Sequence, residues 1–390
     1  MQVNTIFSEL LKLIPRHEFN RIVDKYRGNR YTKTFTGQQE FIVLLFAQIR
    51  GLDSLREIET GLKVQDNKWY HIGLKGVSKS TLADSLKARD SRIYEELFYA
   101  LSGRCRSLSP KHKFRFNNKL FNLDSTSIEL CLSIFEWAKY RERKGAAKLH
   151  CLVEQKESTI PAFIVMSDGL ESDINAAKNS SGIDSELTPD SIVACDRGYV
   201  DFQWFNSLNK KGVYFVSRMK TNILYDEIQE YRFYRNKAII KDSLIELRSK
   251  KSKKLYPEKM RLVEYYDTKT EKYYKFITNN MELSGQTIAD IYKNRWQIEL
   301  FFKWIKQNLQ IKSFLGTTPN ALMTQVWVAM CYYLLLMYIK YQTKFARSLS
   351  ELNLMIKTVL MDRVNLIDIL SLSKKTVKKA REPVPQYSLF

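Results

Sequence analysis

The stretch Ile291–Leu309, IYKNRWQIELFFKWIKQNL, decides how the rest of the sequence is interpreted. At about 100° per residue on a helix, four of its polar residues fall within an arc of roughly 60°: Tyr292, Arg295, Glu299 and Lys306. An apolar stripe lies beside this arc (Ile291, Ile298, Phe302, Ile305, Leu309), and the far side mixes large apolar residues with a few polar ones (Trp296, Leu300, Phe301, Trp304). The pattern therefore predicts one helix that is mostly buried.

A buried carboxylate flanked by two cations is costly unless something pairs with it or binds there. A metal ion for Glu299 and phosphates for Arg295 and Lys306 are the functional candidates. The structural alternative is a core helix on which the two cations simply pair with Glu299.

Two other carboxylates favour the functional interpretation. The run FNLDSTS ends a strand-like alternation at Asp124, and SIVACDRGY ends a second one at Asp196. Taken singly, each aspartate is typical of a turn or a cap. Together with Glu299 they form a set of three carboxylates, two at strand ends and one on a helix. A site for two divalent metal ions that catalyses phosphoryl transfer needs such a set.

The spacing Tyr-x2-Arg-x3-Glu-x6-Lys, from Tyr292 to Lys306, resembles the signature of bacterial DDE transposases of the insertion sequence 4 family. The resemblance implies that Asp124, Asp196 and Glu299 are the catalytic triad and the metal ligands. The opening, FSELLKLIPRHEF followed by KTFTGQQEFIVLLFAQIRGLDSLREIE, also resembles the N-terminal domain of one branch of these proteins. The likeness covers residues 4–340.

Membership of this family implies a DNA-cleaving and strand-joining enzyme with two Mg²⁺ ions, for which Mn²⁺ would substitute. Its partners would be double-stranded DNA, as terminal inverted repeats and target, and a second copy of the chain in a paired-end complex. Its place would be the bacterial cytoplasm, at the nucleoid. Phosphates of the DNA end would contact Tyr292, Arg295 and Lys306, with weaker candidates elsewhere in the chain (Arg197, Arg218, Lys220).

The composition agrees with this interpretation without requiring it. The chain has 390 residues, 44% of them hydrophobic, and a formal net charge of +21, which suggests two or three domains and an anionic partner. A uniformly basic surface could equally serve solubility. However, residues 119–219, which hold both aspartates, are slightly acidic, whereas the segments on either side are basic. This is the layout expected of a cation site bordered by surfaces for a polyanion.

Several other classes of protein fit poorly. The five cysteines and four histidines show no zinc spacing, so reduced structural thiols are expected, and neither a zinc site nor a histidine-based triad. Glu9 and Lys12 interrupt the first apolar stretch, which does not suit a signal peptide. Residues 321–339 are uncharged and long enough to span a bilayer. Gly316, Pro319 and Asn320 nearby favour a buried helix packed on the catalytic sheet instead of a membrane span.

The sequence predicts a helical DNA-binding domain over residues 1–110. Thr36 with Gln39, and Ser54 with Glu57, form capping boxes. A later helix from Ser78 or Ser80 to Arg89 suits a helix-turn-helix-like DNA reader (Lys79, Ser80, Thr81, Lys87, Arg89). A plain helical bundle with a solvated basic face is the alternative. Residues 103–118 are expected to form a basic linker that contacts DNA.

Residues 119–340 are predicted to form an α/β catalytic domain. Strands are expected over KLFNLDST, IELCLSIF, LHCLVEQ, TIPAFIVMS, SIVAC and VYFVS, with helices at residues 173–179 and 202–208. This order resembles the ribonuclease H-like fold of the family, with Asp124 on the first strand and Asp196 just after a later one. A basic, aromatic, β-rich insertion is expected over residues 220–283, where an aromatic such as Tyr231, Phe233, Tyr234, Tyr265 or Tyr266 could stack on a DNA base. Residues 341–390 are expected to be a helical segment followed by a basic tail.

Two alternative functions remain open from the sequence. One is a ribonuclease H-like nuclease, derived from a transposase, that cuts DNA without joining it. The other is a noncatalytic DNA-binding protein that kept the fold. The intact set of Asp124, Asp196 and Glu299 favours a catalytic protein over a decayed one.

Overall fold

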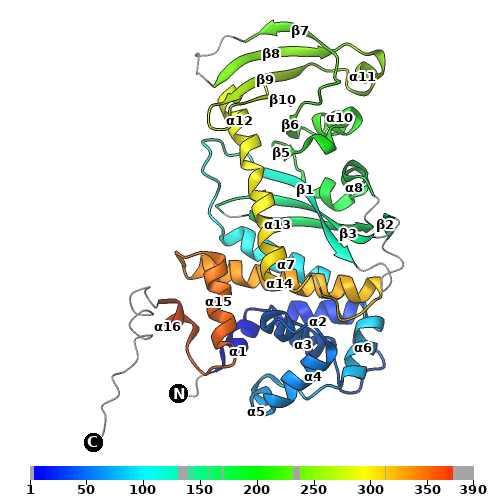
Figure 1. The fold of residues 1–390 in the computed structure, drawn as a ribbon, viewed down its shortest axis with the longest axis vertical. Coiled ribbons are helices and arrows are strands. Elements are labelled where there is room, and N and C mark those ends of the chain that lie inside the picture. Colours follow the sequence, from blue (N-terminus) through cyan, green and yellow to red (C-terminus); the bar gives the residue numbers. More distant parts are fainter. Residues whose placement is uncertain are drawn as a thin grey trace, which may run out of the picture. The chain divides into compact units, whose positions relative to one another are not determined.

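The computed structural model describes residues 4–130, 139–141, 144–157, 159–168, 171–231, 238–311 and 313–371. The chain divides into two compact units (Figure 1). One unit joins the N-terminal part up to Leu108 with the C-terminal part from Asn308, and the other comprises Ser109–Gln307. This division differs from the boundary expected at residue 340, because the helices beyond residue 307 pack with the N-terminal ones.

The described elements of the first unit are helices. Its long helices begin at clear caps: Thr36 forms a capping box with Gln39, and Ser54 and Ser78 accept hydrogen bonds from the first turns of the helices that follow them. The described helices of this unit are α1 (Ile6–Lys12), α2 (Arg16–Lys25), α3 (Gly37–Arg50), α4 (Leu55–Val64), α5 (Asp66–Trp69), η1 (Tyr70–Ile72), α6 (Lys79–Ala88), α7 (Arg92–Leu108), α14 (Pro319–Gln342), α15 (Leu349–Val359) and α16 (Leu366–Ser371).

Helix α14 is the centre of this unit. It is apolar on every side, so it needs neighbours all round, and it packs against α3, α6, α7 and α15. Of the described residues, this is the one helix long and apolar enough to cross a membrane, and 89% of its most apolar window is buried inside the structure. Within this unit α7 and α3 are its main partners, and packing of this helix on the catalytic sheet stays a prediction.

The segment expected to be a linker, residues 103–118, is partly helical. Its first six residues are the last turns of α7, with Cys105 buried beneath them. The four described cysteines are all free thiols and buried, and burial raises the pKa of the Cys105 thiol to about 12. Cys131 lies outside the described residues.

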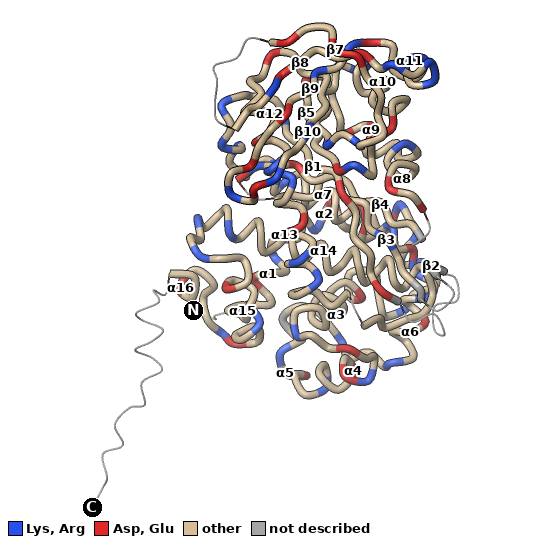
Figure 2. Tube along the Cα trace, turned by 45° about the horizontal axis from the view of Figure 1, so that its top comes forward, with Lys and Arg blue, Asp and Glu red and all other residues tan. Residues whose placement is uncertain are grey.

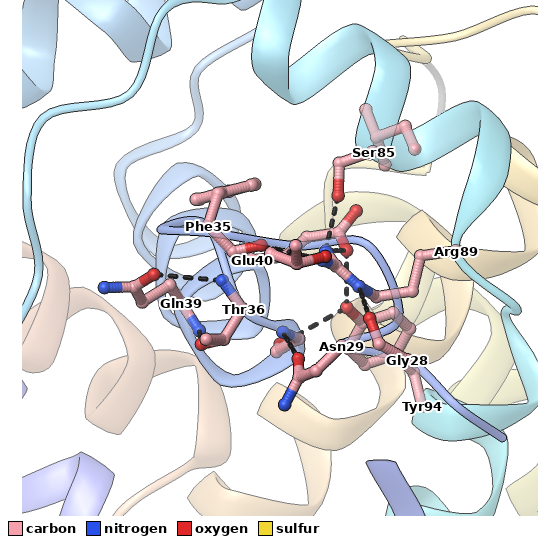
Figure 3. Close-up of polar contacts among 12 residues, drawn as sticks. Gly28, Asn29, Phe35, Thr36, Gln39, Glu40, Ser85, Arg89 and Tyr94 are labelled. Atoms are coloured by element: carbon pink, nitrogen blue, oxygen red, sulfur yellow. Dashed lines mark hydrogen bonds and ion pairs between the residues drawn. The ribbon is translucent and has the colours of Figure 1, made fainter. Parts of the chain in front are cut away.

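Arg89, expected to face DNA, is instead a structural residue of this unit. Its guanidinium is buried and forms an ion pair with the fully buried carboxylate of Glu40 (Figure 3). It also donates to the backbone oxygens of Gly28 and Phe35, at 2.8 Å each. The Tyr94 hydroxyl donates a further hydrogen bond of 2.9 Å to Glu40. A cation committed to so many internal acceptors cannot also read DNA.

The second unit is built on one mixed ten-stranded sheet. Strands β1, β5 and β6 run parallel, β3 is antiparallel to β1, and β4 is antiparallel to β3. The order along the sheet is β2-β3-β1-β5-β6-β10-β9-β8-β7. The strands are β1 (Leu120–Leu130), β2 (Lys139–Arg141), β3 (Lys144–Gln155), β4 (Thr159–Asp168), β5 (Ile192–Cys195), β6 (Tyr214–Arg218), β7 (Tyr225–Glu230), β8 (Ile239–Leu247), β9 (Met260–Asp267) and β10 (Lys272–Thr278).

The two faces of this sheet have separate apolar cores. One core lies under α8 (Asp173–Asn179), α9 (Ser181–Glu186) and α10 (Phe202–Lys210). The other lies under α12 (Gly285–Asn294), whose Ile288 and Ile291 are fully buried. Side chains alternate between the faces along each strand, so Leu120 packs on the α12 side and Leu123 on the α8 side. By the same alternation Asp124 lies on the α12 side.

The region expected to be a β-rich insertion contains β7–β10 and the short helix α11 (Lys250–Leu255). It extends the sheet directly, since β10 pairs with β6. Helix α11 is basic and forms a blue segment in Figure 2 (Lys250, Lys251, Lys253, Lys254). Of the aromatic residues considered for stacking, Tyr265 is buried, and Phe233 and Tyr234 lie outside the described residues. The second half of the predicted strand IELCLSIF and the basic tail from residue 373 also lie outside them.

The buried ion pair predicts a large effect of Arg89→Met on stability. The variant leaves the Glu40 carboxylate buried without its cation, so we expect a loss of about 3–5 kcal/mol in the free energy of unfolding. Arg92→Met is the matched control, because its ion pair with Asp90 is exposed and is worth about 1 kcal/mol or less. Urea unfolding of both variants measures the difference. Equal losses in the two variants would contradict the assignment.

Candidate active site

The register of two neighbouring strands brings Asp124 and Asp196 together. In the parallel pair of β1 and β5, Leu123 lies opposite Cys195. Asp124 follows Leu123 and Asp196 follows Cys195, so the two aspartates lie at the same level of neighbouring strands. Their side chains therefore project from the same face of the sheet. Adjacent strands lie about 4.8 Å apart. Asp196 directly follows β5, as expected, whereas Asp124 lies within β1, which continues to Leu130 because β3 pairs with it over its whole length.

Glu299 reaches this site from a helix that the structure divides in two. Helix α12 ends at Asn294 and α13 runs over Trp296–Asn308, with Arg295 between them in helical geometry. The Arg295 and Ile298 N–H groups donate to carbonyls three residues earlier, so the turn is tightened locally. The sequence pattern predicted a single, mostly buried helix from Ile291. The far side of α13 differs from that prediction, since Trp296 is 57% and Leu300 44% exposed.

Arg295 is the bridge between the carboxylates. Its Nη1 lies 2.6 Å from Asp124 Oδ2, and its Nη2 lies 2.7 Å from Glu299 Oε1. The side chain of Arg295 is only 13% exposed, against 20% for Asp124 and 34% for Glu299. Two charge-assisted bonds from one rigid guanidinium fix the two carboxylates relative to each other. The structural alternative expected Arg295 to pair with Glu299, and the structure shows that pair with Asp124 as an added partner.

The charges of the site act on one another. Burial raises the pKa of Asp124 to about 6, and the neighbouring charges of Asp196 and Glu299 push it in the same direction. The guanidinium of Arg295 and the Ser125 N–H, at 2.8 Å, oppose this rise. Burial would lower the pKa of Arg295, but Asp124 and Glu299 raise it well above its usual range. The site thus favours a cation beside Asp124 and keeps Arg295 charged.

Tyr292 contacts the same cluster of charged side chains. Its hydroxyl is 3.5 Å from Asp196 Oδ1, and the Arg295 guanidinium lies 5.7 Å from the centre of its ring. Burial raises the pKa of Tyr292 to about 12, so the phenol stays protonated near neutral pH. Asp196 also accepts a 2.6 Å hydrogen bond from the N–H of Arg197.

The other predicted DNA contacts are spread around the site. Lys306 lies on α13, two turns beyond Glu299. Arg197 is exposed at the start of η2 (Arg197–Tyr199). Arg218 stacks on Tyr274, with 5.0 Å between its guanidinium and the ring centre. Lys220 donates a 3.0 Å hydrogen bond to the Val200 carbonyl, so it already has one internal acceptor.

A polar network that was not predicted from the sequence lies on the opposite face of the same strands. Ser125, next to Asp124, donates a 2.6 Å hydrogen bond to Asp173 at the start of α8. Lys148 on β3 forms an ion pair of 2.7 Å with the same carboxylate. The fully buried His150 lies 3.5 Å from it and 2.8 Å from Ser167 Oγ. The sequence signal for this network is a Lys and a His two residues apart among the apolar residues in the middle of β3, Lys148 and His150.

The carboxylates have the chemistry of a site for a hard divalent cation. Carboxylate oxygens are the ligands that Mg²⁺ prefers in proteins. Within the described parts of the chain, no three His, Cys, Asp or Glu side chains lie close enough together to hold a metal ion. Arg295 is bonded to two of the three candidate ligands. The donor atoms therefore suit the metal, and the guanidinium supplies the positive charge between them in this structure.

Comparison with known proteins agrees with this chemistry. Residues 117–335 match the model of the transposase DDE domain, and residues 2–75 match a family described as a domain of unknown function. A putative transposase of Sinorhizobium fredii is 31% identical over 65% of this chain and 69% of its own length. A probable transposase for insertion sequence element IS5377 of Geobacillus stearothermophilus is 27% identical over 90% of this chain and 89% of its own. A putative transposase for insertion sequence element IS4SA of Synechocystis is 26% identical over 68% and 73%.

These matches define the class of the protein as a transposase of insertion-sequence type, an enzyme that acts on DNA. The matched domain covers more than half of the chain and contains Asp124, Asp196 and Glu299. The chain belongs to the DDE transposase family. Members of this family generally use divalent metal ions.

The buried His150 predicts a loss of stability in acid. Burial lowers its pKa from 6.5 to about 4, although Asp173 pulls the other way. A histidine that binds its proton less readily when folded stabilises the fold above about pH 6.5, and this contribution is lost as the pH falls towards 4. We expect it to amount to up to about 3 kcal/mol.

The variant His150→Asn removes this titration. Urea unfolding of wild type and variant between about pH 7 and pH 4.5 should give free energies whose difference shrinks in acid. Parallel curves for the two proteins would show that His150 does not titrate as the structure indicates.

Proposed function

We propose that the protein binds the terminal inverted repeats of a bacterial insertion sequence, cleaves them and joins them to target DNA, with Asp124, Asp196 and Glu299 as its catalytic residues. The observation that carries the proposal is that Arg295 bonds two of these carboxylates while the third follows the strand beside β1. Two come from adjacent parallel strands and one from α13, and Arg295 bonds Asp124 and Glu299. All three positions lie in the part of the chain that matches the DDE domain, which supports the assignment.

The strand arrangement supports a ribonuclease H-like catalytic core. The order β4-β3-β1-β5-β6, with β3 antiparallel to its neighbours and β1, β5 and β6 parallel, is the order expected of that fold. In open α/β sheets, ligands bind beyond the carboxyl ends of parallel strands. Asp196 lies at that end of β5. The β-rich segment β7–β10 is then an extension of the same sheet between Asp196 and Glu299.

Asp124, Asp196 and Glu299 are the residues that would hold divalent metal ions, two Mg²⁺ by the family's pattern, with Mn²⁺ as a substitute. Such ions supply Lewis-acid stabilisation of the phosphate and activation of a water nucleophile. Glu299 and Asp124 would exchange their bonds to Arg295 for bonds to the cations. The guanidinium would then be available to a phosphate of the DNA.

The cations near the triad would hold DNA. Arg295, Lys306 and the hydroxyl of Tyr292 would contact phosphates of the element's end, with Arg197 and Arg218 as outer contacts. The spacing from Tyr292 to Lys306 supports a place in the insertion sequence 4 group. By analogy with the family, the protein would act as a homodimer that pairs two ends, at the bacterial nucleoid.

The central test is Glu299→Gln. The glutamine retains an oxygen that can accept the hydrogen bond from Arg295, so the fold and DNA binding should persist, while the charge needed for a metal ligand is lost. We expect metal-dependent nicking of labelled DNA carrying the element's two ends to fall at least about 1,000-fold. DNA affinity in EDTA should change less than about threefold.

Glu258→Gln is the matched control, because Glu258 is exposed in the same unit. Nicking by Glu299→Gln in Mg²⁺ at the wild-type rate would refute the assignment of the triad. Joined products in a strand-transfer assay distinguish a transposase from a nuclease that only cuts. Binding of the ends by wild type without cleavage would favour the noncatalytic alternative.

A further inference from the structure

The loop between α2 and α3, residues 26–36, has an unfavourable backbone conformation at two positions. Arg27 and Tyr31 have positive φ angles of 51° and 59°, although neither is glycine. Such residues persist where the surrounding structure holds them, and they are frequent at ligand-binding sites. The loop belongs entirely to the helical unit.

Buried contacts hold this loop in place. Arg89, fixed by Glu40, donates to Gly28 at the start of the loop and to Phe35 at its end. Between them, Asn29 accepts a 2.8 Å hydrogen bond from the N–H of Gly37 (Figure 3). A Cβ atom at Gly28 would lie 2.5 Å from Ile93 Cδ1, so the loop is also tightly packed on α7. The buried ion pair therefore rigidifies a surface loop.

This loop and α6 line a cavity of about 730 Å³ that is open to solvent. Hydroxyl groups line it from both sides, as do cations and two carboxylates. The hydroxyls belong to Thr32, Thr34, Thr81 and Ser85, the cations to Arg27, Arg30 and Lys33, and the carboxylates to Asp84 and Asp90. Asp90 is already paired with Arg92. The cavity thus offers mainly hydrogen-bond donors and positive charge.

The three cations of the loop are presented to solvent. Arg27, Arg30 and Lys33 are all exposed, and no ion pair joins them to an acidic residue in the described parts of the chain. Arg30 is also oriented: its guanidinium stacks 4.7 Å from the ring centre of Tyr31 and donates a 2.8 Å hydrogen bond to the hydroxyl. Tyr31 itself is 90% exposed. A rigid loop that orients a cation outward lowers the entropic cost of binding an anion.

We propose that this loop and the adjoining α6 form a binding site for the sugar–phosphate backbone of double-stranded DNA. The inference rests on the proposed function, which makes DNA the polyanion that this protein meets. Guanidinium, ammonium and hydroxyl groups on one rim are the donors that contact phosphate oxygens. In this site α6 contributes the hydroxyl groups of Thr81 and Ser85, which line the cavity. Arg89 holds the loop in place through its hydrogen bonds to Gly28 and Phe35.

The test is DNA binding in EDTA, where cleavage plays no part. Full-length wild type and Arg30→Ala/Lys33→Ala are titrated against a labelled duplex of about 30 base pairs at several salt concentrations. Each lost phosphate contact reduces the slope of log K against log salt by about 0.9. We expect the double variant to bind at least about tenfold more weakly at moderate salt, with a slope smaller by about one to two.

Lys63→Ala/Lys357→Ala is the matched control, since it removes the same charge from exposed helical positions that do not line the cavity. Tyr31→Gly tests the orientation of Arg30 without a change in charge, because it relieves the positive φ and removes the stacking ring. We expect it to bind at least about threefold more weakly than wild type, with unchanged thermal unfolding.

The proposal would be overturned if wild type and the double variant had equal affinity and salt slope, or if the double variant and its control lost affinity equally. Tighter binding of an RNA duplex than of DNA would also overturn it. So would the absence of DNA binding by wild type. The outcomes that compare the double variant with wild type and with its control are separable from failure of the proposed function, whereas absence of binding by wild type would overturn both proposals. Cleavage by Glu299→Gln tests the triad alone, and salt-dependent binding in EDTA tests the loop alone.

Discussion

The ionic contact of Arg295 with Asp124 and Glu299 is the constraint on which the catalytic unit depends. Three carboxylates at close quarters repel one another, and burial of Asp124 adds to the cost of its charge. One guanidinium with two bonds of 2.6 and 2.7 Å offsets both effects. The same contact joins β1 to α13, so the position of the helix and the charge balance of the site are set together. A cation at this place thus offsets the cost of bringing these carboxylates together.

The sheet supplies the second constraint. Because β1 and β5 are parallel with Leu123 opposite Cys195, the residues that follow them must emerge side by side. The network of Ser125, Asp173, Lys148 and His150 then fixes β1 from the opposite face. The helical unit uses a comparable device, since the buried pair of Arg89 and Glu40 holds the loop between α2 and α3. In both units a buried charge supports polar residues at the surface.

Local signals in the sequence were reliable where the physics is local. Thr36 with Gln39 marked the start of α3, the alternation around Asp124 marked β1, and SIVAC marked β5. Signals whose outcome depends on a residue far away in the sequence were not reliable. The apolar residues 321–339 predicted burial, but they did not predict that α3 and α7 would be neighbours of this helix. Arg89 had the type and position of a DNA-reading residue, yet Glu40, 49 residues away in sequence, binds it internally.

The sequence by itself determined the class of this protein and its chemical groups. Helical spacing aligned Tyr292, Arg295, Glu299 and Lys306, and two strand-like runs presented Asp124 and Asp196. Periodicity and residue type are written directly in the chain, so these features could be predicted. Only the tertiary structure decided that Arg295 joins Asp124 to Glu299, that Asp173 and His150 support the same strand, and that a rigid basic loop borders α6. These contacts depend on strand register and on side chains that meet across 171, 48 and 61 residues of sequence, and no local pattern encodes such pairings.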